Sequence, residues 1–530
     1  MTPTTVWFGI LVPVLLSALL ARALWAAVAT ETCARWLLAA SRAEPIPLAS
    51  DRDPWLVVLL PMLREQTAAP STIAAFAALT YPSHRAVVAV ITTDREEVDR
   101  HRHRTRLPDL AARDTLFAGD LHGLFPVGRC DHVAAAVNTS PPSRRFGLLA
   151  ALFDAEPTTA QVVETVASRL PDNCLPVVHL HQPAAGGRKA GQLNYVVNRL
   201  EQILGPSGWH PQQDADNTYF LIYDADALPD NRTLTAFARA AIRHQDRTGH
   251  APEVIQQQRL PLLGRRPIPA GATGLLLAEE WVYQLRRSLG IELARIRLHQ
   301  HLAGARLPGI VRTLLRPMIY GVGCGMAVQL AALRTIGGFP EPMEDLGTGH
   351  RLSLLGATST PSTVAVLDEP YIEPSGLTNL HALAFTASAR PDLHARAVAA
   401  QPSRISRAAR AALILREGAD EAAWLIGAPL TAAAVTSSWQ AGPAWTGVAV
   451  LGIVLHGPLL TARLLHLAPA LHAAVQPPAG SGRPPQAAAG HRATLIAASP
   501  LQPFIRLIGP WRLIGRRLIG RATEFGKTER

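Results

Sequence analysis

The sequence predicts an α/β protein whose sheet carries helices on both faces, with transmembrane helices added to it. Residues 54–61 form a continuous apolar run, and an alanine-rich helical stretch separates this run from a second strand at residues 86–92. Strand, helix and strand at this spacing begin a doubly wound parallel sheet. A third run of β-forming residues, 218–223, ends in carboxylates, and residues 6–30 are apolar over a length that can cross a bilayer.

The composition argues against two classes of function. The chain has 530 residues and a formal charge of +11, but residues 506–530 hold seven Lys or Arg and two Glu, which supplies +5 (7 − 2) of that charge. The charge is therefore concentrated in the tail and does not indicate nucleic-acid binding. The four cysteines form no Cys-x-x-Cys pair, so neither a zinc site nor a disulfide framework is expected. They are Cys33, Cys130, Cys174 and Cys324.

The apolar stretch at residues 6–30 is expected to be a retained membrane anchor. A cleavable signal peptide is the alternative, but no Lys or Arg precedes the apolar run, and the run is long for such a peptide. Arg35 and Arg42 follow it. By the positive-inside rule the amino terminus is then outside, and the bulk of the chain is cytoplasmic.

Two carboxylates, Asp224 and Asp226, follow the strand at residues 218–223 and so lie at its carboxyl end. Ligands bind at that edge of an open α/β sheet, and paired carboxylates there suit Mg²⁺ or Mn²⁺ held against a diphosphate. A solvated acidic turn is the alternative. Asp214 and Asp216 repeat the pattern before the strand. We expect this second copy in a surface loop at the opposite edge.

Two glycine-rich segments can bring backbone close to a ligand, although each is also compatible with a plain loop. Lys189 follows Gly186-Gly187, and apolar residues at helical spacing from 193 to 203 place it near a helix amino terminus, where anions bind. The second segment, residues 321–325, is a turn centred on Gly323.

Several further features complete the pattern. Asp94 closes the second strand and can meet a nucleotide base or ribose, or can simply be an exposed carboxylate. Glu344 and Asp345 begin a helix, where an acidic pair is also explained by the helix dipole.

A strand is expected at residues 253–258, and a helix at 275–289. Residues 100–157 show little periodicity and predict an irregular insertion without an assigned function.

The order and spacing of these elements resemble the family 2 glycosyltransferases, particularly the membrane-bound branch that includes cellulose, chitin and hyaluronan synthases. The resemblance covers roughly residues 54–374. It rests on an ordered set of motifs, each weak alone: Leu60-Pro61, Lys189-Ala190-Gly191 to Leu193-Asn194, Asp224-Ala225-Asp226, Gly337-Gly338-Phe339 and Glu344-Asp345.

The resemblance implies a GT-A fold with a mixed sheet. It implies that Asp226, assisted by Asp224, holds Mg²⁺ or Mn²⁺ on the diphosphate of the sugar donor. It also implies that Asp345, with Glu344 beside it, is the general base. The residues expected at the nucleotide sugar are Asp94, Lys189, Asp224 and Gly323.

The sequence departs from the polysaccharide synthases in one element. These enzymes carry Gln-x-x-Arg-Trp after the acidic pair, whereas the nearest candidate here is Gln401-Pro402-Ser403-Arg404-Ile405. The missing Trp removes an aromatic platform for an acceptor sugar, so transfer of a single sugar is favoured over polymerisation. Residues 525–530, Phe-Gly-Lys-Thr-Glu-Arg, look like the Trp-x-Lys-Thr tail of some bacterial members.

The carboxyl-terminal part predicts a membrane hairpin and a basic tail. Residues 422–438 and 444–462 are apolar and flanked by tryptophans, although a buried helical pair is the alternative. The tail pattern favours a helix lying on anionic lipid, with a disordered basic segment as the alternative. The expected domains are a transmembrane anchor (1–48), a GT-A domain (49–376), a connecting region (377–420), the hairpin (421–466), a linker (467–492) and the basic amphipathic tail (493–530).

Together these features predict an inverting glycosyltransferase of the bacterial inner membrane, multi-pass, with its catalytic domain in the cytoplasm. The expected donor is a nucleotide sugar, and the expected acceptor is a lipid-linked or envelope glycan. Two alternatives remain. The first is a processive polysaccharide synthase, and the second is a catalytically inactive homologue that serves as a membrane scaffold.

Overall fold

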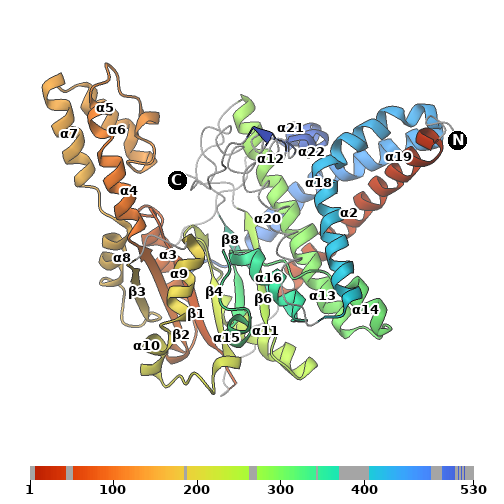
Figure 1. Ribbon diagram of the computed structural model, residues 1–530, viewed down its shortest axis with the longest axis horizontal. Coiled ribbons are helices and arrows are strands. Elements are labelled where there is room, and N and C mark those ends of the chain that lie inside the picture. Colours follow the sequence, from red (N-terminus) through yellow and green to blue (C-terminus); the bar gives the residue numbers. More distant parts are fainter. Residues whose placement is uncertain are drawn as a thin grey trace.

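The computed structural model describes residues 6–42, 52–183, 188–261, 271–341, 344–368, 405–478 and 492–505, with five single positions beyond these. An eight-stranded sheet lies at the centre, in the order β3-β2-β1-β4-β7-β6-β8-β5 (Figure 1). The strands are β1 (Trp55–Pro61), β2 (Ala86–Thr93), β3 (Val177–Gln182), β4 (Thr218–Ile222), β5 (Ala227–Leu228), β6 (Val254–Pro261), β7 (Met326–Gln329) and β8 (Ser359–Asp368).

The sheet is mixed, as the family resemblance implied, rather than wholly parallel. Strands β3, β2, β1 and β4 are parallel. Strand β7 is antiparallel to both of its neighbours, β4 and β6, while β8 runs parallel to β6. Strands β6 and β8 therefore point the same way as β4. The carboxyl ends of β1, β2, β4, β6 and β8 all lie at one edge.

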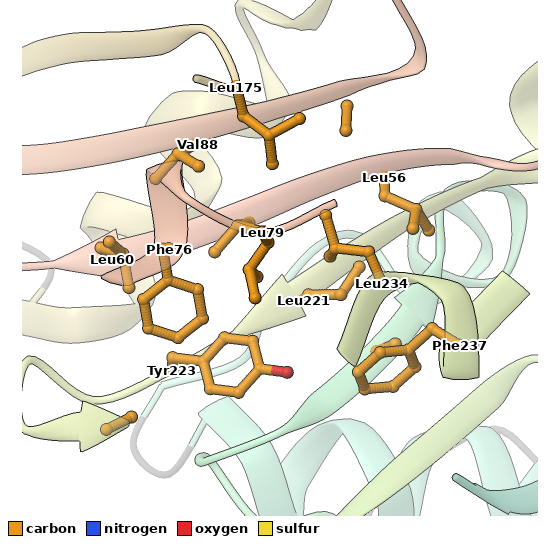
Figure 2. Packing of buried hydrophobic residues seen from close by; sticks show 14 of the residues in the cluster. Leu56, Leu60, Phe76, Leu79, Val88, Leu175, Leu221, Tyr223, Leu234 and Phe237 are labelled. Atoms are coloured by element: carbon orange, nitrogen blue, oxygen red, sulfur yellow. The ribbon is translucent and has the colours of Figure 1, made fainter. Parts of the chain in front are cut away.

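Helices cover both faces of the sheet because successive strand residues point to opposite sides. Leu56, Val58 and Leu60 of β1 pack on one face. On that face the rings of Phe76 and Tyr223 lie 4.6 Å apart (Figure 2). The helices there are α3 (Ala69–Ala77), α8 (Thr159–Ala167) and α11 (Thr233–Thr248). The opposite face carries α9 (Arg188–Val197), α10 (Leu200–Leu204), α15 (Leu330–Thr335) and α16 (Glu344–Leu354).

The segment between β2 and α8 is helical, which corrects the expectation of an irregular insertion at residues 100–157. Its helices form a unit that stands away from the sheet (Figure 1) and has its own core around Leu110, Val133 and Phe153. The many Arg, His and Pro residues on the exposed sides hid the apolar spacing. The helices are α4 (Arg95–Arg104), α5 (Leu107–Ala111), α6 (Val127–Asn138) and α7 (Pro142–Asp154).

Two helical segments are long and apolar enough to cross a membrane, Trp7–Arg42 and Pro443–Ala474. The first comprises a π-helical turn and α2 (Val12–Arg42). The second joins α19 (Pro443–Val454), the π-turn η7 (Leu455–Leu459) and α20 (Leu460–Ala474).

The segment expected to form the first arm of the hairpin is not apolar enough to count as a membrane-crossing helix. It is the second half of α18 (Arg407–Ala441), where many Ala, Ser and Thr residues lower the hydropathy. Helix α20 also continues past residue 466 to Ala474, into the segment expected to be a linker.

A third set of helices joins the apolar helices to the sheet. The helix expected at residues 275–289 is longer, since α12 (Gly271–Arg287), the π-turn η6 (Ser288–Leu293) and α13 (Ala294–Gly304) follow one another directly. Leu285, Leu37 and Leu464, from α12, α2 and α20, share one core with Leu260 and Leu367 of the sheet. The remaining helices are α14 (Gly309–Leu315), α21 (Arg492–Ala498) and α22 (Gln502–Ile505). Most of the tail predicted to lie on lipid is outside the described residues.

Candidate active site

Three carboxylates meet at the carboxyl edge of the sheet. Oxygen atoms of Asp224, Asp226 and Asp368 lie within 4.8 Å of one another. Asp224 and Asp226 follow β4, and Asp368 is the last residue of β8. The short strand β5 brings them together, because Ala227 pairs with Asp368. Thr72 fixes the intervening loop by donating its hydroxyl to the carbonyl of Ala225 over 2.5 Å.

Asp368 was missed by the sequence reasoning. The sequence signal for Asp368 was a β-branched run that ends in an aspartate. The closeness of Asp368 to Asp226, however, depends on the pairing of β5 with β8.

Arg259 of β6 lies 3.1 Å from Asp368 and 3.5 Å from the buried Glu292. Burial alone would lower the pKa of Arg259, but these two carboxylates raise it above its ordinary value. Arg259 is therefore a fixed cation beneath the carboxylate cluster.

Lys189 lies between the carboxylate cluster and the start of α16. Its Nζ is 2.7 Å from Oδ1 of Asp224 and 3.3 Å from Oε1 of Glu344. Burial alone would lower the pKa of Lys189, yet Asp224 and Glu344 raise it above its ordinary value. Lys189 stands in the first turn of α9, as predicted. It is charged and links two elements that are 120 residues apart (344 − 224) in the sequence.

Asp345 faces the glycine turn at residues 321–325. Its Oδ2 accepts the backbone N–H of Gly323 at 2.9 Å, and its Oδ1 accepts that of Leu346 at 2.7 Å. Burial and the neighbouring charge of Glu344 raise the pKa of Asp345 to about 6, although Lys189 and the two backbone donors oppose the shift. The carboxylate is thus oriented, part-buried and more basic than an ordinary aspartate.

The tight turn before β7 and the packing of α16 explain why this segment needs glycines. Gly325 has a φ of +80° and donates its N–H to Ile222, which places the turn beside the end of β4. A side-chain carbon on Gly349 would lie 2.4 Å from the carbonyl oxygen of Ile319. Helix α16 can therefore approach the turn closely only because residue 349 is glycine.

Helix α9 holds the other motifs in place. The side chain of Asn194 donates to the carbonyl of Phe339 at 2.9 Å and accepts its N–H at 2.8 Å. Gln192 donates to the carbonyls of Met62 and Ile91, at the ends of β1 and β2. The Gly-Gly-Phe segment before α16 is thus fixed to the helix that carries Lys189.

Asp94 is a predicted site residue that lies apart from the cluster, whereas Asp214 and Asp216 were expected outside the site. Asp94 follows β2 at the same sheet edge, but within the described part of the chain its contact is with His181, at 2.7 Å, rather than with the carboxylate cluster. Asp214 and Asp216 precede β4, at the opposite edge. Gln401 to Ile405 offers no test of the missing Trp, since residues 369–404 lie outside the described residues.

Comparisons with known proteins complete the description. No family model matches the chain, and no curated protein matches it. Among solved structures, the mannosyltransferase PcManGT from Pyrobaculum calidifontis, in complex with GDP-Man and Mn²⁺, is 16% identical with a TM-score of 0.42, over 88% of this chain and 97% of the other.

S. aureus TarS 1-349 is 12% identical with a TM-score of 0.34, over 88% of this chain and 93% of TarS. Its complex with UDP-GlcNAc is 11% identical with a TM-score of 0.35, over the same shares. At these TM-scores the similarity does not by itself assign an activity to this chain.

Proposed function

We propose that this protein is an inverting, metal-dependent glycosyltransferase of family 2 that transfers a sugar from a nucleotide-diphosphate donor to a membrane-associated or envelope acceptor. The observation that carries the proposal is the meeting, at one sheet edge, of three kinds of group. These are a carboxylate cluster suited to a hard cation, a part-buried lysine beside it, and an oriented carboxylate of raised pKa on the far side of that lysine.

The carboxylates fit a divalent metal because their oxygens, drawn from three positions, lie within 4.8 Å. When bound by Asp224, Asp226 and Asp368, Mg²⁺ or Mn²⁺ supplies positive charge that stabilises the departing diphosphate. Lys189 adds a second, fixed positive charge on the same side of the site.

Asp345 is the residue that fits the role of general base. It accepts the proton of the acceptor hydroxyl as that oxygen attacks the anomeric carbon, and the nucleotide diphosphate leaves from the opposite face. The N–H groups of Gly323 and Leu346 hold the carboxylate in one orientation. The raised pKa brings its basicity closer to neutral pH, where proton transfer is most effective.

A location in the bacterial inner membrane is part of the proposal. The two long apolar segments run side by side, and α18 connects the catalytic domain with their far end, where Trp7 of the first turn donates to Ser437 of α18 at 3.4 Å. If the two long segments cross the bilayer, the chain must cross in the other direction along α18. The catalytic domain then faces the cytoplasm, where nucleotide sugars are made.

A panel of nucleotide sugars tests the function. We expect the purified full-length protein to release nucleotide diphosphate from one donor class in the presence of Mn²⁺ or Mg²⁺, and to stop when the metal is chelated. The variant Asp226→Asn serves as the matched negative control. If no donor is bound or cleaved with either metal, the scaffold alternative is correct instead.

A further inference from the structure

The short helix α14 carries a group of apolar side chains that the described part of the chain leaves exposed. The exposed residues in and just before this helix are Leu307, Ile310, Val311, Leu314 and Leu315. Ile310 alone is 68% exposed. Single exposed apolar residues are common on protein surfaces, but several together mark a site of interaction with another molecule or with a membrane.

Helix α14 is amphipathic and basic. At 3.6 residues per turn, its four exposed apolar residues share one side, whereas Arg312 lies on the other. Residues 302–316 contain Arg306, Arg312 and Arg316 but no Asp or Glu. A helix with an apolar side and arginines on its polar side is typical of segments that lie in the plane of a membrane surface.

Helix α13, which precedes α14 in the chain, meets α2 just beyond the apolar run of that helix. Arg297 of α13 donates to the carbonyl of Thr32 at 3.0 Å. Its guanidinium also lies over the ring of Trp36, 5.4 Å from the ring centroid. The apolar run at residues 6–30 has ended at this point. A tryptophan in this position is typical of the interface between a membrane and water.

Arg416 fixes the end of α14 at a matching level of α18. Its guanidinium donates to the carbonyls of Leu315 and Arg316 at 3.2 and 2.7 Å. Arg416 begins a charged stretch that ends at Glu421, and the apolar residues 422–438 follow directly. The segment that contains α13 and α14 therefore lies where both α2 and α18 change from apolar to charged. This change is expected at the boundary between acyl chains and headgroups.

A second exposed apolar surface lies on the other side of the long helices. Leu501 and Phe504, just before and within α22, are exposed. Helices α22 and α14 lie on opposite sides of the place where α2, α18 and α19 leave the body of the protein, and these three helices extend away from both (Figure 1). One plane can therefore contain both apolar surfaces and be crossed by the long helices. This is the geometry of a protein seated on one face of a bilayer.

We propose that α14 lies in the headgroup layer at the cytoplasmic face of the membrane, with its apolar side toward the acyl chains. The apolar side chains then leave water, which is the main gain of such a contact. Arg306 and Arg312 attract the phosphates of anionic lipids. The inference rests on the membrane location proposed above, but not on the transfer reaction.

The position of α14 ties the membrane surface to the catalytic residues. Six residues (321 − 315) separate the end of α14 from Gly321, which begins the glycine turn. Met318, between them, packs in one cluster with Leu413 of α18. The turn that binds Asp345 is thus held from the membrane side. The proposed general base therefore stands close to the bilayer surface, which suits a lipid-linked acceptor.

Spin labels on the full-length protein in nanodiscs test the inference without any nucleotide sugar. Cys174→Ser first removes the one cysteine that is not buried. A single label is then attached at Ile310→Cys or, as the matched control, at Phe117→Cys. Phe117 is 66% exposed, about as much as Ile310, but belongs to the helical unit that stands away from the sheet (Figure 1).

The two labels should differ in nanodiscs of phosphatidylglycerol and phosphatidylcholine. The label at position 310 should be more accessible to oxygen than to a water-soluble nickel chelate. Its depth should be about 5–10 Å into the boundary between headgroups and acyl chains. The label at position 117 should show the reverse preference, because its surroundings are water.

The outcomes separate this inference from the proposed function. The same preference for the nickel chelate at positions 310 and 117 would overturn the inference. Exclusion of both probes at position 310, with dipolar coupling between the labels of two copies, would mean that a second copy covers α14, and would overturn it too. A protein that does not enter the nanodiscs would overturn the membrane location together with this inference. Because no sugar donor is present, the expected depth at position 310 supports the inference even if the protein transfers no sugar.

Discussion

The backbone N–H of Gly323 donates to Oδ2 of Asp345 across 2.9 Å, and position 323 has little room for anything larger than glycine. A side-chain carbon there would lie 3.2 Å from that oxygen and 3.3 Å from Nζ of Lys189. Both are the ends of flexible side chains, which can shift. Gly321, two residues earlier, faces backbone instead, since its added carbon would lie 2.4 Å from the carbonyl oxygen of Asp345.

The two glycines therefore predict different defects. Gly323→Ala should displace Asp345 and Lys189 and reduce the transfer rate at least about tenfold, with little change in melting temperature. Gly321→Ala should destabilise the fold by about 1–3 kcal/mol because backbone must move. Gly309→Ala, with open space around it, is the control for both. Thermal melts and initial rates on the same preparations would refute this account if Gly323→Ala lost stability and kept its activity.

The two Asp-Ala-Asp copies provide an internal comparison. Changing Asp224 and Asp226 to Asn should abolish Mn²⁺-dependent donor binding, because only this pair joins Asp368 at the carboxyl edge. The same change at Asp214 and Asp216 should leave donor binding nearly intact. Titration of donor with and without Mn²⁺ measures both effects, and equal losses from the two double variants would contradict the assigned metal site.

Individual strands and helices could be predicted from the sequence, but the contacts between residues far apart in the chain could not. Strands β1, β2 and β4 were recognisable because buried parallel strands are continuous apolar runs. Lys189 was placed at a helix start by the apolar spacing that follows it. Asp368 escaped notice because its neighbour Asp226 is 142 residues away (368 − 226) in the chain. Only the pairing of Ala227 with Asp368 brings the two together.

Two further elements were hidden for other reasons. Strand β3 contains the partly buried His179 and the exposed His181, so its apolar signal is weak. The helices between β2 and α8 pack on one another rather than on the sheet, and their exposed sides carry most of the charge. In both cases polar side chains that lie at the surface interrupt the apolar spacing by which a strand or a helix is recognised.

The raised pKa of Asp345 predicts a pH dependence. A general base must be unprotonated, so the single-turnover rate at saturating donor should fall as the pH drops below about 6, by up to tenfold per pH unit. In the folded chain the Asp345 carboxyl stays protonated up to a higher pH than in the unfolded chain. The contribution of Asp345 to stability therefore decreases as the pH rises from about 4 to about 6. A rate that stays constant from pH 5 to pH 8 would argue against Asp345 as the base.

Arg232 links the segment that follows the Asp224–Asp226 carboxylates to the apolar helices. It pairs with the fully buried Asp230 at 2.7 Å and donates to the carbonyls of Ser41 and Ala474, at the ends of α2 and α20. Arg232→Ala removes the charged partner of a buried carboxylate and should cost about 3–5 kcal/mol. Arg52→Ala, which breaks an exposed pair with Asp246, should cost at most about 1 kcal/mol. Chemical denaturation in detergent compares the two, and similar losses would show that Arg232 is not a structural link.

The most direct test of the central claim is a comparison of donor affinity and single-turnover transfer in Asp345→Asn. A general base acts only while the acceptor proton moves, so the variant should bind donor as the wild type does and transfer sugar about 10²- to 10⁴-fold more slowly. If Glu344 and Asp345 only stabilise the start of α16, the folded variant will transfer at close to the wild-type rate, and that result would remove Asp345 from the mechanism.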